Sequence, residues 1–146
     1  MLVATLADIA LESLDQALAI SRSLSPEEAI KALVKDRLRM IRAHLEQIQI
    51  MFQEARFYPE VREQFMDLML RYGMARLKEW LDGIDGSVLP VPVPVLLATL
   101  IGTLFMILTW TDWFGRDFFG LTDEEIAHWV AALITHGLLV DKGAGA

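Results

Sequence analysis

Apolar residues recur at helical spacing along almost the whole chain, so the pattern predicts one helix after another. One unbroken apolar stripe, with steps of three and four residues, follows the segment after Ser25 as far as the Phe57-Tyr58-Pro59 break. The expected helices cover approximately residues 2–22, 25–57, 59–83, 95–114 and 123–139. The fold class predicted is therefore all-α, a bundle of about five to six helices.

Two helix starts carry capping boxes, in which a hydroxyl side chain caps the helix and a glutamate three residues later reaches back. They are Ser25 with Glu28 and Thr122 with Glu125. The only strand-like alternation is the Val-Pro-Val-Pro run near residue 92, where proline removes the hydrogen-bond donors that a sheet needs. We expect one helical domain over residues 1–140 and a frayed tail over 141–146.

The run from Val95 to Thr111 contains no charged residue and raises the question of a membrane span. At about 1.5 Å per residue it extends roughly 26 Å, short of the roughly 30 Å hydrocarbon core. The prolines before it are not expected to extend it, and no basic cluster flanks it. We therefore predict a helix covered by protein, with a membrane span as the alternative.

The last helix is also apolar on more than one side, so two adjacent helices need more covering than a chain of this size supplies. A second copy, packed as a four-helix bundle about a two-fold axis, is the natural source, which predicts a homodimer. The alternative is that both helices form the core of a larger monomeric bundle. The residues expected near the two-fold axis are Gly102, Leu104, Leu108, Ile126, Val130, Leu133 and Gly137.

The amino-acid composition and the net charge limit which functions this chain could have. Hydrophobic residues make up 54% of the chain, and the net charge is −7 with the basic residues scattered singly. Phosphate binding needs a concentrated basic surface, so this chain alone is not expected to bind DNA. The absence of cysteine excludes disulfides and fits a reducing compartment, and the N-terminus lacks the basic start of a signal peptide. The expected location is the cytoplasm.

Enzyme chemistry has little support in the sequence. Glu125 and His128 have the Glu-x-x-His spacing of carboxylate-bridged metal sites, but no second copy of that motif exists and Glu125 is explained as a capping residue. The serines lie in no nucleophile pattern, and no glycine-rich phosphate loop is present. We expect no catalytic site, no metal and no cofactor.

Several segments together resemble the C-terminal ligand-binding and dimerisation region of tetracycline-repressor (TetR) type transcriptional regulators. They are LVATLADIALESLDQAL, SPEEAI, PEVREQFMDLM, the all-apolar helix and LTDEEIAHWVAALITHGL. The resemblance implies a cytoplasmic sensor for a small hydrophobic ligand. DNA binding, as in a repressor, is implied only for a parent protein, whose helix-turn-helix domain would precede Met1 and is missing from this sequence, either because the chain is a fragment or because that domain was lost or left out. The alternative is a stand-alone helical dimer that acts as a protein-interaction module.

A ligand pocket is expected between the second, third and fourth helices, with mostly apolar walls and a few polar groups. Arg37 interrupts an apolar stripe, either to bind an acidic group or paired with Glu12 or Asp15 of the first helix; the second option favours a neutral ligand. His44 is a pocket residue or a hydrogen-bonded core histidine. The predicted ligand residues are Arg37, Met40, His44, Met51, Phe65, Met69, Tyr72, Trp80, Phe105 and Trp110.

Overall fold

The computed structural model describes residues 2–84 and 89–139, and within these ranges every regular element is helical, so the all-α prediction is confirmed. The expected tail at 141–146 lies outside the described residues. The α-helices are α1 (Leu2–Ser21), α2 (Pro26–Ala43), α3 (Leu45–Phe57), α4 (Pro59–Phe65), α5 (Tyr72–Asp82), α6 (Val93–Phe114) and α7 (Asp123–Leu138). A π-helical turn, η1 (Met66–Arg71), joins α4 to α5, and a 3₁₀ turn, η2 (Arg116–Phe118), lies between α6 and α7.

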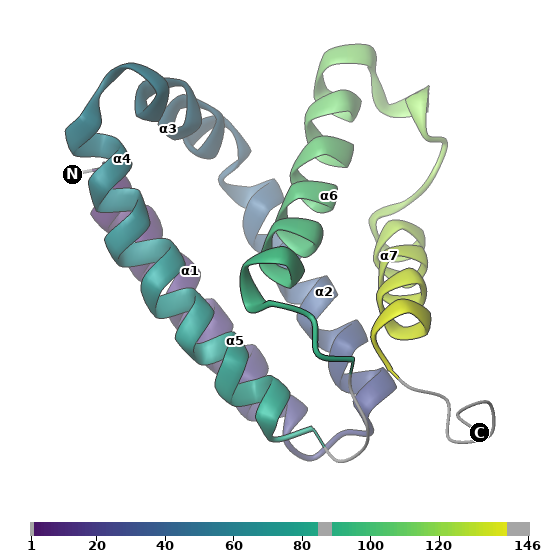
Figure 1. Cartoon of the computed structure of the whole chain (residues 1–146). Coiled ribbons are helices and arrows are strands. Elements are labelled where there is room, and N and C mark those ends of the chain that lie inside the picture. The colour runs from purple at the N-terminus through teal and green to yellow at the C-terminus, as the bar shows by residue number, and fades with distance from the viewer. Residues whose placement is uncertain (1, 85–88, 140–146) are drawn as a thin grey trace.

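Helix α2 is the centre of the bundle, because α1, α6 and α7 all pack against it. Its buried side includes Ile30, Val34 and Ile41, each no more than 2% exposed, and the predicted stripe therefore faces the core. Figure 1 shows α1 and α5 side by side on one flank of the molecule and α7 on the other. The Ser25 hydroxyl accepts a hydrogen bond from the Glu28 backbone N–H, as expected for the cap of α2.

The predicted second helix is in fact two helices, since the chain bends at His44 between α2 and α3 (Figure 1). His44 has φ −125° and ψ 24°, outside the helical region, and ends α2 while it begins α3. The bend carries α3 away from α2 towards α4 and α6. The apolar spacing continues across this point without glycine or proline, so the sequence pattern gives no sign of the break.

The predicted third helix is continuous from Pro59 to Asp82, but its middle turn has π geometry. A π turn inserts an extra residue into the helix and rotates everything after it relative to a regular 3.6-residue stripe. Residues on α5 are therefore displaced around the helix from the positions that the sequence pattern predicts.

Helix α6 begins two residues earlier than predicted, at Val93, with Pro92 as its N-cap and Pro94 in its first turn. Proline is tolerated there because the first N–H groups of a helix have no intrahelical partner. The helix has 22 residues, or about 33 Å at roughly 1.5 Å per residue. The length argument against a membrane span was therefore wrong, because it counted only the run from Val95 to Thr111.

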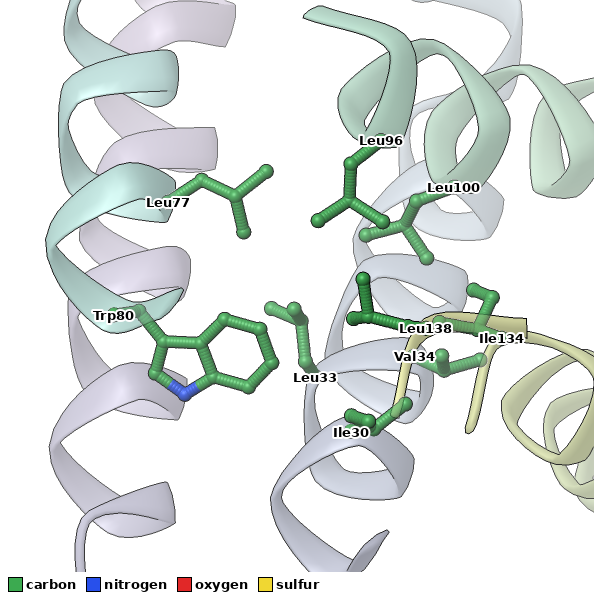
Figure 2. A pocket seen from close by; sticks show the side chains of 9 residues that line it. All are labelled: Ile30, Leu33, Val34, Leu77, Trp80, Leu96, Leu100, Ile134 and Leu138. Atoms are coloured by element: carbon green, nitrogen blue, oxygen red, sulfur yellow. The ribbon is translucent and has the colours of Figure 1, made fainter. Parts of the chain in front are cut away.

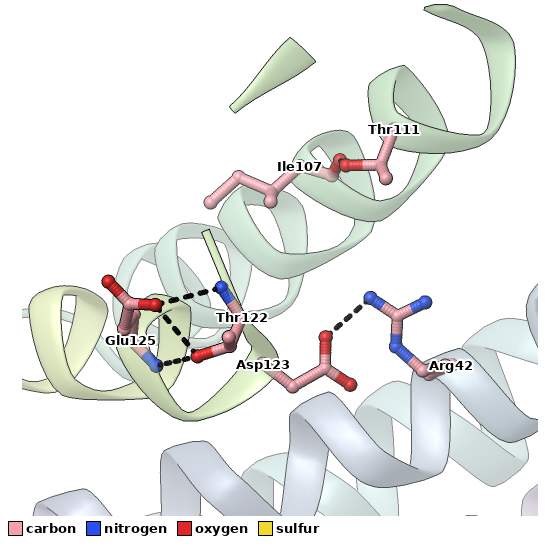
Figure 3. A network of polar contacts seen from close by, with 6 residues as sticks. All are labelled: Arg42, Ile107, Thr111, Thr122, Asp123 and Glu125. Carbon is pink, nitrogen blue, oxygen red and sulfur yellow. Dashed lines mark hydrogen bonds and ion pairs between the residues drawn. The ribbon is translucent and has the colours of Figure 1, made fainter. Parts of the chain in front are cut away.

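Helix α7 starts with the complete capping box predicted for it: the Thr122 hydroxyl accepts from the Glu125 N–H, and the Glu125 carboxylate accepts from the Thr122 N–H (Figure 3). Ion pairs with α2 fix the same end, since Arg42 Nη2 lies 2.6 Å from Asp123 Oδ1 and Lys35 Nζ lies 3.4 Å from Glu124 Oε1. The start of α7 is thus tied to the side of α2.

Candidate functional site

The main candidate site is the side of α6 and α7 that points away from α2, which we call the outer face. It comprises residues of both helices at helical spacing, all exposed except the half-buried Gly102: Val95, Ala98, Gly102, Met106, Trp110, Trp129, Leu133 and Gly137. Leu133 is 74% exposed, Trp129 58% and Val95 53%, values more typical of charged side chains. Large apolar side chains gathered on one face mark an interaction site.

The outer face also lacks the charges that normally keep exposed helices soluble. The only charged residue within α6 is Asp112, near its C-terminal end. In α7 the formal charges are confined to the acidic first turn, residues 123–125. Both helices are therefore apolar on the side covered by α2 and uncharged on the side that a single chain leaves open, where Thr99, Thr103, His128 and His136 are exposed beside the apolar residues.

Four of the residues predicted near a two-fold axis lie on the covered side instead. Leu104 is fully buried, and Leu108, Ile126 and Val130 are at most 6% exposed within one chain. These four side chains fill the chain's own core, so their assignment to a dimer surface was wrong. Gly102, Leu133 and Gly137 remain on or beside the open side of their helices, and only they still fit that prediction.

At two positions of the outer face, nothing within the chain requires glycine rather than a larger residue. A Cβ atom placed on Gly102 or on Gly137 meets no heavy atom within 4 Å, and both residues lie inside regular helices. Glycine inside a helix costs roughly 0.5–1 kcal/mol relative to alanine. Small residues on an open helix face allow another helix to approach closely, and Gly102 is one of the residues expected near the two-fold axis.

An aromatic cluster continues the outer face at the C-terminal end of α6. Trp110 lies against Phe118 and Phe119, with ring centroids 6.2 and 6.3 Å away, and Phe114 packs on Phe118 at 5.3 Å. Trp113 and Phe114 are 65% and 64% exposed. Gly115 and Gly120, both at positive φ, allow the connection to turn back towards α7. Trp110, predicted as a ligand residue, belongs to this surface cluster.

Two other predicted ligand residues are brought together by a residue that the prediction did not include. The ring of Phe52, on α3, lies 5.5 Å from that of Phe65 and 5.2 Å from that of Phe105, both edge-on. The cluster joins α3, α4 and α6. Phe52 lies in the same stripe as Ile48, so its spacing was visible, but the direction of α3 after the bend was not.

The remaining predicted ligand residues are spread over the bundle. Met40 and Met51 are core residues, 8% and 2% exposed, and His44 lies half-buried at the bend. Tyr72 is 52% exposed and faces solvent. The side chain of Met69 lies outside the described part of the structure.

Arg37 is buried, 5% exposed, but its partner is not the predicted Glu12 or Asp15. Its guanidinium donates to the Asp36 carboxylate at 2.6 and 2.9 Å and to the Ala10 carbonyl of α1 at 3.1 Å. Ser13 of α1 donates to the other oxygen of Asp36 at 2.6 Å. Burial lowers the pKa of Arg37 below its usual value, while the Asp36 carboxylate opposes that shift. The group fastens α1 to α2, and Arg37 is already paired.

Figure 2 shows a small apolar space between α2, α5, α6 and α7, close to the predicted pocket. Leu77 and Trp80 of α5 face Leu96 and Leu100 of α6 across it. Its volume is about 10 Å³, whereas ligand pockets measure about 300–1,000 Å³. Trp80 is the only predicted ligand residue that lines it, and a ligand would enter only if these side chains moved apart.

Two further properties bear on function. Of the described helices, α6 alone is long and apolar enough to cross a membrane. Only 28% of its most apolar stretch of 18 residues is buried within the chain. Within residues 2–84 and 89–139, no three histidine, aspartate or glutamate side chains are grouped as metal ligands would be.

No family model matches the sequence, and comparison with curated proteins and with solved structures gave no match either.

Proposed function

We propose that this chain is a dimerisation and effector-binding domain of the kind found in TetR-type transcriptional regulators, and that two copies associate through the outer face of α6 and α7. The observation that carries the proposal is the uncharged and largely apolar outer face, which the chain's own helices leave open. DNA binding would belong to a separate helix-turn-helix domain.

A second copy explains the outer face better than a lipid bilayer does. The apolar surface extends over two helices, and α7, with 16 residues, is about 24 Å long and too short to span. The acidic first turn of α7 is ion-paired to α2 beside the same surface. Gly102 and Gly137 favour a close helix–helix contact, for which a lipid surface has no requirement.

The effector-binding part of the proposal rests on the family resemblance and on the aromatic cluster of Phe52, Phe65 and Phe105. This cluster lies between α3, α4 and α6, next to the elements that change direction at His44 and at η1. A small hydrophobic ligand that separated these rings would move α6, and with it the outer face. The effector site at the Phe52 cluster and the dimer interface on the outer face would then share helix α6.

The proposal is tested by sedimentation equilibrium of the wild-type chain and of two variants. We expect the wild type at twice 16.5 kDa and Leu133→Glu as a monomer, since burying an unpaired charge costs several kcal/mol. Gly102→Leu should also dissociate, although one chain has room for the new side chain. The matched control is Glu63→Leu on exposed α4, which should remain dimeric. A wild-type monomer at micromolar concentration would overturn the proposal, as would extraction that requires detergent.

A further inference from the structure

A second cavity lies at the opposite end of α5 from η1, where the ends of α1 and α5 meet the start of α2. Its volume is about 150 Å³, comparable with a cavity of roughly 150 Å³ that binds benzene in another protein. We call it the turn pocket. It is lined by Leu18, Ser21, Arg22, Leu24, Pro26, Ala29, Glu79, Trp80, Gly83 and Ile84.

The floor of the turn pocket combines apolar side chains with one fixed polar group. Leu18 and Ala29 are buried, and Trp80 and Ile84 line the same pocket. The Ser21 hydroxyl, 3% exposed, donates to the Leu18 carbonyl at 2.8 Å and accepts from Trp80 Nε1 at 2.9 Å. This hydrogen bond holds the indole edge in place, so the pocket has a rigid aromatic wall.

The rim of the turn pocket carries one free charge of each sign. Arg22 and Glu79 are exposed pocket-lining residues, and in the part of the chain that the structure describes neither forms an ion pair. The last carbonyl groups of α1 and α5 also point towards this end of the bundle, and helix C-termini attract cations. A ligand with only one charge would leave one of the two rim residues without a partner.

We propose that the turn pocket binds a small zwitterion with an apolar body, the chemistry of a free hydrophobic α-amino acid. Its ammonium group pairs with Glu79, its carboxylate pairs with Arg22, and its side chain lies against Trp80 and Leu18. The pocket is formed within one chain, so this inference does not rest on the dimerisation proposal.

The experiment is a titration of the ¹⁵N-labelled chain with L-phenylalanine, followed through the indole N–H signal of Trp80. Trp80→Phe assigns that signal among the four tryptophans. We expect it to shift on addition of up to roughly 10 mM ligand, where even a millimolar site is mostly filled. The signals of Trp113 and Trp129 should not move. A Trp80 signal that stays in place over this range would overturn the proposal.

Two sets of comparisons test the head-group recognition. Arg22→Gln and Glu79→Gln should each weaken binding about two- to fivefold, the range of an exposed ion pair, while Arg62→Gln and Glu63→Gln on exposed α4 should not. Phenethylamine and 3-phenylpropanoate, which each carry one of the two charges, should bind more weakly than phenylalanine. Equal binding of either one, or no effect of both rim variants, would show that the pocket does not recognise a zwitterion.

Discussion

The interface between α1 and α2 is buried within one chain, whereas the outer face of α6 and α7 is left exposed by it. Between α1 and α2 even a charged residue is accommodated, because Arg37 is paired with Asp36 and bonded to the Ala10 carbonyl. On the outer face, apolar side chains such as Leu133 and Trp129 have no cover. The first surface is covered within a single chain and the second is not, and this contrast is the basis for the proposal that two copies associate through α6 and α7.

The largest effect should come from breaking the buried group between α1 and α2. Arg37→Met leaves Asp36 with a side chain only 16% exposed and without its cation, and removing one partner of a buried pair costs about 3–5 kcal/mol. We expect a loss of about 3 kcal/mol in the free energy of unfolding, measured with urea at fixed protein concentration. Arg42→Met removes the exposed pair with Asp123 and should cost less than about 1 kcal/mol. Equal losses of unfolding free energy in both variants would mean that the buried Arg37–Asp36 pair stabilises the fold no more than an exposed ion pair does.

Substitutions of two leucines distinguish the side of α6 and α7 that is covered within one chain from the side that is left open. Leu104→Ala creates a cavity at a fully buried position and should cost about 3 kcal/mol at every protein concentration. Leu133→Ala removes an exposed side chain, so its effect on the melting temperature should be largest where the wild type is dimeric and vanish on dilution. Melting curves over a concentration series measure both. A concentration-independent effect of Leu133→Ala would place Leu133 inside the fold of one chain.

A bound hydrophobic effector should raise stability by roughly 2.7 kcal/mol at about one hundred times its dissociation constant. A thermal-shift screen of hydrophobic compounds should give hits whose effect falls in Phe65→Ala and His44→Ala, because Phe65 belongs to the Phe52 cluster and His44 forms the α2–α3 bend. Tyr72→Ala, at an exposed position, serves as the control. Hits that are unchanged by the first two substitutions would show that the effector binds elsewhere.

The smallest effect concerns the cap that fixes the start of α7. Thr122→Ala removes the hydroxyl that accepts from the Glu125 N–H and should cost about 1 kcal/mol in urea unfolding. Thr122→Ser keeps the hydroxyl and should retain most of that stability. If alanine and serine behave alike, the capping box contributes nothing measurable to the fold.

Caps and proline breaks made the helix boundaries predictable from the sequence, whereas the orientation of the helices relative to one another was not predictable. The Thr122 box and the proline break at residue 59 act within a few residues, so sequence alone located them. The bend at His44 interrupts no apolar spacing, and the π turn at η1 looks like ordinary helix in the pattern. Both lie in elements that contact segments distant in the sequence, α3 with α6 and η1 with α1, and the apolar spacing does not record such contacts.

The outer face shows the same limit most clearly. A helix with one apolar stripe indicates which side is buried, as α2 does. Helix α6 is apolar all round, so its sequence did not distinguish Leu104, which packs on the core, from Met106, which is 38% exposed. For such helices the sequence predicts that both sides are covered without indicating which neighbour covers each.

The most direct test of the outer face is the distance between two copies measured by spin labels. The chain has no cysteine, so Leu133→Cys places one label on the outer face, and Gln16→Cys places one on the exposed side of α1 as a control. Leu133→Cys is read at a concentration where sedimentation confirms the dimer. We predict a short intermolecular distance for the label at 133 and a distance across both molecules for the label at 16. A short distance at 16 and a long one at 133, or no intermolecular signal from either, would contradict the assignment of α6 and α7 as the dimer interface.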